Sequence, residues 1–399
     1  MASTAGSRPA RGRHRNPADT RRRMYRRRRV AVALLAALVI LALPVGWSYA
    51  GALAAPGNDG VMARTVEWLR DNGGGGAVDW AERQWFGMNQ PPEGGTPDAP
   101  IDLPQAVQGE HDSPAGKHPT PNHLTPPAPL VSPAVEPVPN EGVWRPTATV
   151  DGIPALYATE VRPDDTHTSL LVGVTWMDPN LLKFRQFPGA KLPGGSWATP
   201  DEVPPDQQQD LVAAFNGGFR MEDSQGGFYL DGKAKPDLQD GIASLVIKRD
   251  GTPVVCQWGR DQQMAPDVAS VRQNLSLLVD DAKPSPDIAD TSSKKWGVTL
   301  GNKIFDWRSG IGTTAQGALV WVGGPGLSVS TLADTLVRAG AVRAMELDIN
   351  PDWVTFNLYN STPGGVTGTR LLPNAKKPGD RYLSADSRDF VAAFARAPA

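Results

Sequence analysis

Hydrophobic and polar positions divide the chain into one long apolar run and many short apolar segments. Residues 30–49 (VAVALLAALVILALPVGWSY) carry no charged side chain. A helix rises about 1.5 Å per residue, so a run of this length spans the hydrocarbon core of a bilayer, which is about 30 Å thick. We therefore predict a transmembrane helix at 30–49.

Short apolar segments dominate the chain from residue 141 onward. Runs bounded by Gly, Pro, Asn and Asp are typical of β-strands, and they occur at 169–176, 210–216, 243–258 and 318–324. Turns between them, such as Asp250-Gly251, indicate antiparallel pairing.

A helix is indicated at 331–339, where apolar side chains recur at helical spacing and Gly340 ends the pattern. Thr331 and Asp334 approximate a capping box at its start. Strand-like segments precede and follow this helix, which is the order of a parallel crossover. We therefore predict an α+β fold for residues 141–399, with a mixed sheet that contains a strand–helix–strand crossover.

The distribution of charge predicts how the apolar run is oriented in the membrane. Residues 1–29 contain 11 Arg and a single acid, Asp19. Basic segments next to a membrane helix stay in the cytoplasm, so this pattern predicts a basic cytoplasmic tail at 1–29 and an extracellular C-terminal domain. A nucleic-acid-binding arm and a cleaved signal sequence are the alternatives, the second because small residues follow the run.

The segments between the helix and the domain differ in composition. Residues 50–86 predict two short amphipathic helices next to the membrane, separated by a run of glycines. Residues 87–140 are rich in Pro and polar residues, which predicts a disordered, extended linker.

The exported part is acidic, because the chain after residue 29 holds 29 basic and 41 acidic side chains. That charge argues against nucleic acid as a partner. Cys256 is the only cysteine, so no intramolecular disulfide can form. The domain also lacks a phosphate-binding loop and a nucleophile-elbow motif, and its single histidine, His167, excludes a zinc site built from histidines.

Two acids interrupt the apolar strand predicted at 342–349. Strand alternation places Glu346 and Asp348 on one face, near the end of the strand. Paired carboxylates suit the cleavage of a glycosidic bond, with one as acid and the other as base or nucleophile. They equally suit a divalent cation such as calcium. A structural alternative pairs each acid with an arginine.

Two further segments are candidates for binding. In AAFNGGFR, Asn216 precedes Gly217 and Gly218, which allow a ligand to approach the backbone closely or simply form a hairpin turn. In FDWRSGIG, Arg308 could hold a phosphate or carboxylate, or it could be an ordinary surface side chain.

These segments together resemble a known family. FNGGF, RSGIG…GALVWVGG and LADTLVRAGAVRAMELD occur in the order of motifs in the phosphodiester glycosidase domain, over residues 213–350. That domain occurs in the lysosomal enzyme that removes N-acetylglucosamine from a sugar phosphodiester, and in many bacterial proteins.

The resemblance implies functional roles for the matching residues. Asn216, Gly217 and Gly218 match the family's Asn-Gly turn; Arg308 and Gly312 match its Arg-Thr-x-x-Gly element, with Ser309 replacing Thr. Asp348 matches the acid of its Asn-Leu-Asp-Gly-Gly motif. Here Glu346 replaces Asn, and Ile349 and Asn350 replace the two glycines. Because a β-branched residue does not readily adopt glycine backbone angles, we expect the loop after Asp348 to differ from the family's.

The combined interpretation is a membrane-anchored extracytoplasmic hydrolase that cleaves a sugar-1-phosphodiester bond in envelope glycans. Asp348 and Glu346 would be catalytic or would bind a divalent cation. Arg308 would clamp the phosphate, and Asn216, Gly217, Gly218, Gly312 and Asn350 would contact the substrate. Trp353 is a candidate platform for a sugar ring, with an ordinary core aromatic as the alternative. The alternative function is a non-catalytic glycan-binding or scaffold protein on the same fold.

Overall fold

The computed structural model describes residues 17–98, 103, 122–290, 295–297 and 305–396. It divides at Ala55 into two units, of which the first contains helix α1 (Pro17–Leu53). Within α1, the stretch Met24–Leu53 contains an apolar window and is long enough to cross a membrane, and a signal sequence would have the same properties. The predicted span at 30–49 lies inside it.

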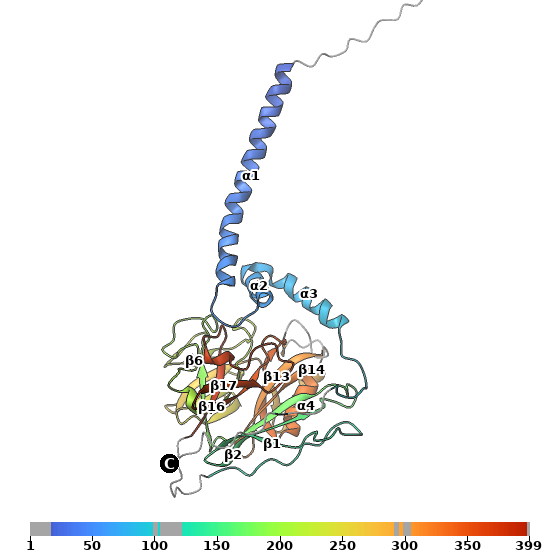
Figure 1. Ribbon diagram of the computed structural model, residues 1–399, viewed down its shortest axis with the longest axis vertical. Helices are drawn as coiled ribbons and strands as arrows, with labels where there is room; N and C mark the ends of the chain where they lie inside the picture. The colour runs from blue at the N-terminus through green and yellow to red at the C-terminus, as the bar shows by residue number, and fades with distance from the viewer. Residues whose placement is uncertain (1–16, 99–102, 104–121, 291–294, 298–304, 397–399) are drawn as a thin grey trace, which may run out of the picture. The chain divides into compact units, whose positions relative to one another are not determined.

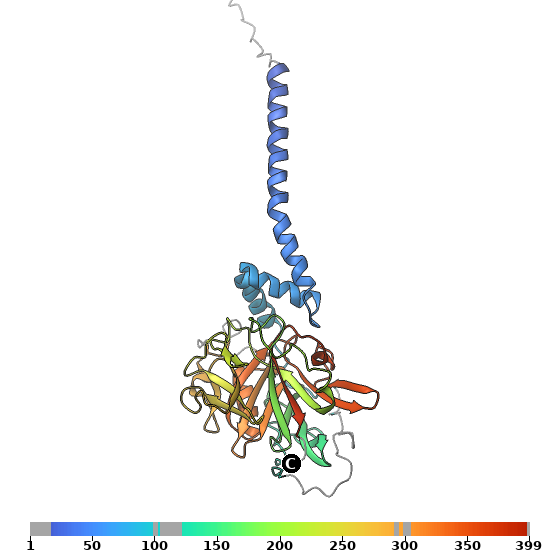
Figure 2. The same cartoon turned by 90° about the vertical axis from the view of Figure 1, so that its left-hand side faces the viewer.

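The second unit, which begins at Pro56, is built mainly from antiparallel strands (Figures 1 and 2). Its largest sheet has eight strands, in the spatial order β1 (Arg145–Val150), β2 (Ile153–Val161), β3 (Val172–Met177), β14 (Leu319–Leu327), β13 (Asp306–Thr314), β15 (Ala341–Ile349), β11 (Leu277–Asp280) and β12 (Lys283–Pro284).

Two five-stranded sheets complete the domain. One has the order β17 (Gly365–Arg370), β16 (Phe356–Thr362), β5 (Leu211–Asn216), β18 (Phe390–Ala395) and β4 (Leu182–Phe187). The other has the order β7 (Lys233–Ala234), β6 (Phe228–Leu230), β10 (Val268–Gln273), β8 (Ala243–Lys248) and β9 (Pro253–Gln257). Short 3-10 turns lie at Gln208–Asp210, Pro286–Ala289 and Arg381–Leu383.

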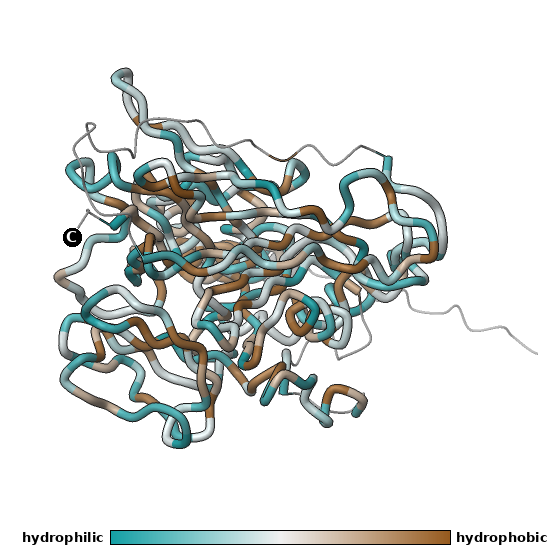
Figure 3. Tube along the Cα trace, turned by 90° about the horizontal axis from the view of Figure 1, so that it is seen from below, coloured by the Kyte–Doolittle hydropathy of each residue, from teal (hydrophilic) through white to brown (hydrophobic). Residues whose placement is uncertain are grey.

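The main hydrophobic core lies where the three sheets meet. Met345 and Leu347 of β15 pack there with Phe215 of β5 and Ile247 of β8. Figure 3 shows hydrophobic segments along the central strands and hydrophilic ones in many of the loops. The core therefore fixes β15 and β5, which carry two of the candidate motifs, against each other.

Helix α4 (Val329–Arg338) covers the other face of the eight-stranded sheet. Its buried Leu332 and Leu336 join a second hydrophobic cluster with Val320 and Val322 of β14. The crossover β14–α4–β15 confirms the predicted strand–helix–strand order. β14 and β15 run in the same direction but are not neighbours, because β13 lies between them and pairs antiparallel with both.

The start of α4 differs slightly from the prediction. Ser328, not Thr331, is the N-cap residue: its hydroxyl accepts from the Thr331 amide at 3.2 Å, and the Thr331 hydroxyl accepts from the Ser328 amide at 2.9 Å. The capping box thus lies three residues earlier in the chain than expected.

The compact unit begins well before residue 141. Helices α2 (Val61–Leu69) and α3 (Gly75–Met88), joined by a π-helical turn at Arg70–Gly74, belong to it. The described end of the predicted linker, 122–140, also contacts the strands: Leu130 is buried in the cluster beneath α4, and the Leu124 amide donates to Asp178 at 2.6 Å. The central part of the predicted disordered linker, 99–102 and 104–121, lies outside the described residues.

The cap of α4 gives a test of this local structure. We expect Ser328→Ala to lower the free energy of unfolding by about 1 kcal/mol, because the Thr331 amide loses its acceptor. Chemical denaturation measures this loss. Ser384→Ala is the control, since Ser384 is exposed; an equal effect in both variants would contradict the capping role.

Candidate active site

The end of strand β15 carries the candidate acids, and an extra residue there separates them. In the pairing of β13 with β15, Gly310 lies opposite Glu346 and Arg308 lies opposite Ile349. The interval is therefore three residues on β15 but only two on β13. Such a β-bulge interrupts the alternation of side chains. Accordingly Met345 and Leu347 face the central core, whereas Ile349 packs on the cluster beneath α4.

The bulge corrects the prediction that Glu346 and Asp348 present one shared pair of carboxylates. Asp348 lines a cavity of about 230 Å³, whereas Glu346 is not among the residues that line it. Glu346 is fully buried, and its Oε1 accepts from Arg308 Nη1 at 2.7 Å. Burial raises the pKa of Glu346 to about 6, against the opposing effect of Arg308.

Arg308 does not lie where a phosphate clamp requires it. Its side chain is completely buried, and it donates to Glu346 and to the Leu327 carbonyl at 3.0 Å. The structural alternative, an acid paired with an arginine, therefore describes Glu346 and Arg308. Gly312 is also a packing residue, since a Cβ there would lie 2.7 Å from the Ala341 Cβ.

Asn216 supports Asp348 from behind through Ser309. Asn216 Nδ2 donates to Ser309 Oγ at 3.1 Å, and that hydroxyl accepts from the Asp348 amide at 3.3 Å. Ser309 Oγ is also 3.3 Å from the Asp348 carbonyl oxygen. Three separate motif segments thus meet at the bulge. Asn216 itself is buried and does not line the cavity.

Gly217 and Gly218 serve close packing rather than a hairpin turn. Neither has a positive φ. A Cβ at Gly217 would lie 2.1 Å from Asp389 Oδ2, and one at Gly218 would lie 3.1 Å from the Arg272 guanidinium. Arg272 and Asp389 form a buried ion pair at 2.8 Å, so these glycines let the backbone pass directly over it.

The cavity is lined by buried arginines that the sequence did not single out. Arg388, just before β18, donates from Nη1 to Asp348 Oδ2 at 2.9 Å and from Nη2 to Glu67 Oε1 at 2.9 Å. Arg220, just after Gly218, lies 3.2 Å from Glu67 Oε2. The Nε atoms of Arg388 and Arg220 have no hydrogen-bond partner among the described residues. One carboxylate from α2, Glu67, therefore bridges two arginines.

Trp353 lines the same cavity, but a cation covers its ring. The Arg388 guanidinium lies 3.7 Å from the ring centroid, a close cation–π contact. Asn350 also lines the cavity and has a φ of 93°. Asn tolerates that left-handed region better than most residues, so it adopts a conformation that glycine favours, while Ile349 remains in the strand.

A second acid, Asp306 at the start of β13, also lines the cavity, and no sequence pattern identified it as a candidate. Its Oδ2 is buried without a hydrogen-bond partner among the described residues. Burial raises the pKa of Asp306 to about 7. Burial likewise raises the pKa of Asp348 to about 7, while Arg388 and the Ile349 amide at 2.8 Å oppose the rise.

The two acids of the calcium hypothesis both have arginine partners. Asp348 and Glu346 each face an arginine, which competes with a metal ion for the same oxygens. Within the described ranges, no group of three or more His, Cys, Asp or Glu residues is placed to hold a metal. The calcium hypothesis therefore gains no support from the arrangement of these two acids.

Comparison with known proteins follows the motifs that build this site. Residues 209–348 match the phosphodiester glycosidase family. This confirms the resemblance, and the match ends at Asp348 itself. No curated protein matches the chain.

Solved structures show distant likenesses. The catalytic domain of zebrafish N-acetylglucosamine-1-phosphodiester alpha-N-acetylglucosaminidase, auto-inhibited by its pro-peptide, is 18% identical; the alignment covers 61% of this chain and 82% of that one, with a TM-score of 0.39. A hypothetical protein from Synechocystis is 12% identical over 62% of this chain and 64% of that one, with a TM-score of 0.37. A putative exported protein from Burkholderia pseudomallei is 11% identical over 56% and 74%, with a TM-score of 0.30.

The buried Asp306 gives a pH-dependent test. Folding raises the pKa of Asp306 from 3.8 to about 7. Between about pH 4 and pH 7, Asp306 is therefore protonated in the folded chain and ionised in the unfolded chain. Wild-type stability should therefore fall across that window by roughly 1.4 kcal/mol per pH unit from this group alone. We expect Asp306→Asn to become more stable relative to wild type as the pH rises from 4 to 7.

Chemical denaturation at several pH values measures this difference. Asp206→Asn is the control, because Asp206 is exposed. A stability difference between Asp306→Asn and wild type that stays constant with pH would show that Asp306 ionises normally in the folded chain.

Proposed function

We propose that this protein is a hydrolase that cleaves the bond between the anomeric carbon of a sugar and a phosphodiester. The observation that carries the proposal is the cavity at the end of β15, where Asp348 and Asp306 lie with two buried arginines, Arg388 and Arg220. The family match over residues 209–348 supports the same chemistry.

The arginines supply a site for the phosphate. Both are buried, and each keeps an unused Nε–H donor beside the cavity. Guanidinium groups bind phosphate oxygens through parallel, charge-assisted hydrogen bonds. Glu67 bridges the two arginines, while Asp71 and Glu222 pair with Nη2 of Arg220. A phosphodiester would replace the Glu67 carboxylate with its own anionic oxygens.

Burial raises the pKa of both acids to about 7, so their hydrogen-bond partners are what distinguish them. Asp348 accepts hydrogen bonds from Arg388 and from the Ile349 amide, which favour its ionised form. Asp306 has an unpartnered oxygen in a buried position, which favours its protonated form. We assign Asp348 as the carboxylate that faces the anomeric carbon and Asp306 as the acid that protonates the leaving phosphate oxygen.

The reaction balances with water alone. The bond between the anomeric carbon and the phosphate oxygen breaks, and Asp306 gives its proton to that oxygen. Water adds to the anomeric carbon, and its proton restores the acid. The products are a free sugar and a phosphomonoester. In this assignment Glu346 is a positioning residue, because it contacts Arg308 rather than the cavity.

Helices α2 and α3 cover the proposed site. Glu67, Arg70, Asp79, Glu82 and Phe86, all from α2 and α3 and the turn between them, line the cavity. Asp71 adds a further ion pair to Lys191 at 2.6 Å. Substrate that binds the arginines must therefore displace Glu67, which restrains access.

We also propose an anchored, extracytoplasmic location, with α1 crossing the membrane and residues 1–29 in the cytoplasm. The apolar stretch and the Arg-rich tail support this orientation. Envelope glycans that contain sugar-1-phosphodiesters are substrates within reach of such a domain.

Sugar release tests the proposed activity. We expect the full chain to release free sugar from methyl-capped sugar-1-phosphodiesters, with no change on addition of a chelator. Asp348→Asn and Asp306→Asn should each lower kcat by at least about 100-fold, since each removes a group that acts in proton transfer or charge stabilisation.

Glu346→Gln tests whether Glu346 or Asp348 is the catalytic carboxylate. If Glu346 only positions Arg308, this variant should retain far more activity than Asp348→Asn. Binding of the phosphodiester without turnover, unchanged in Asp348→Asn and Asp306→Asn, would instead support the non-catalytic glycan-binding function.

Glu67 gives a second test. We expect Glu67→Gln to lower KM several-fold, because a neutral amide competes less well than a carboxylate for Arg388 and Arg220. Glu82→Gln is the matched control, since Glu82 lines the same cavity but pairs with Arg70. A loss of activity in Glu67→Gln as large as that in Asp348→Asn would place Glu67 in the catalytic machinery.

A further inference from the structure

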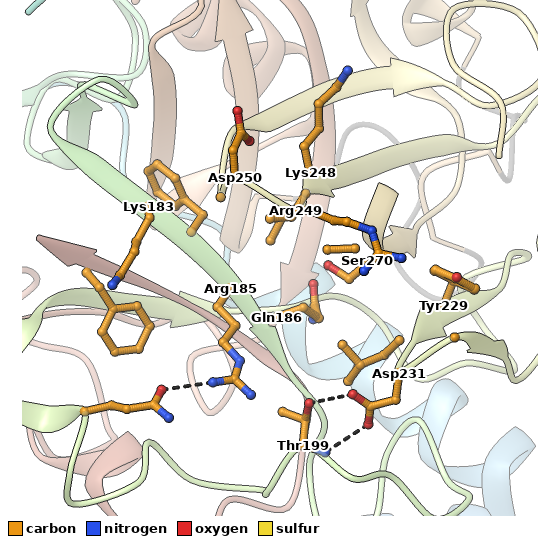
Figure 4. Close-up of a pocket in the computed structure, with 18 of the residues that line it drawn as sticks. Lys183, Arg185, Gln186, Thr199, Tyr229, Asp231, Lys248, Arg249, Asp250 and Ser270 are labelled. Atoms are coloured by element: carbon orange, nitrogen blue, oxygen red, sulfur yellow. Dashed lines mark hydrogen bonds between the residues drawn. The ribbon is translucent and has the colours of Figure 1, made fainter. Parts of the chain in front are cut away.

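A larger pocket, of about 710 Å³, lies where strand β4 faces the sheet of β6, β8 and β10 (Figure 4). It shares no lining residue with the cavity at Asp348. The proposed hydrolysis uses none of its side chains. Most of its lining residues are charged or polar, and three aromatic residues, Phe184, Tyr229 and Phe394, lie among them.

Three cations of the pocket have no acidic partner. Lys183, Arg185 and Arg249 make no ion pair with any described carboxylate, whereas Lys248 pairs with Asp267 at 2.7 Å. In Figure 4, Arg185 lies near the middle of the view, with Lys183 and Arg249 on either side. The pocket thus holds three cations that no described carboxylate pairs with directly, although three acids, Asp210, Asp231 and Asp250, also line it.

Arg185 is the most confined of the three. Its Nη1 donates to Gln207 Oε1 at 2.9 Å, and its guanidinium lies 5.0 Å from the Phe187 ring centroid. Burial lowers the pKa of Arg185, and the more distant Asp231 and Asp206 offset this only partly. Partial burial of a guanidinium without a counter-ion is costly, and an anionic ligand would remove much of that cost.

Two of the three acids that line the pocket accept hydrogen bonds from backbone amides rather than from its cations. Asp231 accepts from the amides of Ala198 and Thr199 at 2.7 and 2.9 Å and from the Thr199 hydroxyl at 2.8 Å. Asp250 accepts from the Thr252 amide at 2.8 Å. Because these two carboxylates bind backbone amides, the guanidinium groups stay available to a ligand.

An unpartnered acceptor completes the wall. Gln186 is 1% exposed, and its Oε1 has no hydrogen-bond partner among the described residues. Figure 4 places it between Arg185 and Ser270. A buried acceptor without a donor is destabilising unless a ligand supplies one, and a sugar hydroxyl is such a donor.

We propose that this pocket is a second binding site, for a sugar unit that carries a phosphate group. Lys183, Arg185 and Arg249 bind the phosphate, Gln186 accepts from a hydroxyl, and Tyr229 offers an aromatic surface to the ring. Planar polar side chains combined with an aromatic residue suit a sugar, and the guanidinium groups add recognition of the phosphate. This site requires no bond cleavage, so it does not depend on the proposed hydrolase activity.

Binding of a sugar phosphomonoester tests the proposal. With the full chain in detergent, we expect glucose 6-phosphate to bind in isothermal titration calorimetry, and glucose and inorganic phosphate each to bind at least about tenfold more weakly. Arg185→Gln and Lys183→Gln should each reduce affinity for glucose 6-phosphate by about tenfold or more. Lys283→Gln, at an exposed lysine on β12, is the matched control and should have no effect.

Asp348→Asn distinguishes this pocket from the cavity at β15, and it should leave the affinity for glucose 6-phosphate unchanged. Failure of wild type to bind, or equal binding by Arg185→Gln and wild type, would overturn the proposal. Equal affinity for inorganic phosphate and glucose 6-phosphate would overturn the assignment to a sugar. Loss of binding in Asp348→Asn but not in Arg185→Gln would assign the ligand to the other cavity.

Discussion

The guanidinium of Arg388 joins three parts of the chain that are far apart in sequence. It pairs with Asp348 at the end of β15 and with Glu67 of α2, each at 2.9 Å, and it covers the ring of Trp353. Burying an arginine is costly unless its charge is neutralised and its donors are used. Asp348 and Glu67 provide that neutralisation, so the position of each depends on the same buried cation.

This constraint also connects the helices before the domain to the site. α2 contributes no large hydrophobic surface to the described cores, yet Glu67 is only 9% exposed, because it is held between Arg388 and Arg220. Any anion that binds these arginines more strongly than Glu67 would release α2 from that contact. Anion binding at Arg388 and Arg220 would therefore be coupled to the position of α2 through charge.

Much of the fold could be predicted from the sequence, because local patterns determine it. The strands β5, β8, β9 and β14, helix α4 and strand β15 follow from apolar periodicity and turn residues, and the apolar stretch of α1 follows from its length. The earlier start of the compact unit, before the predicted boundary at residue 141, could not be found in this way. Leu130 lies in a Pro-rich segment, and only its tertiary contacts with the cluster beneath α4 show that the compact unit begins earlier.

The arrangement of the candidate site could be predicted only in part. Asp348 and the junction with Asn216 and Ser309 follow from motifs, but the separation of Asp348 from Glu346 depends on a β-bulge that strict alternation cannot reveal. Arg220 stands directly after the FNGGF motif and could have been singled out there. Arg388 and Asp306 have no local signal, because their importance arises from burial and from partners distant in sequence.

The most direct test of this account is a crystal structure of the Asp348→Asn chain with an intact sugar-1-phosphodiester. We expect the phosphate to lie between Arg388 and Arg220, with Glu67 displaced from both. The anomeric carbon should face residue 348, with Asp306 beside the leaving oxygen. A phosphodiester bound elsewhere, with Glu67 still paired to both arginines, would contradict it.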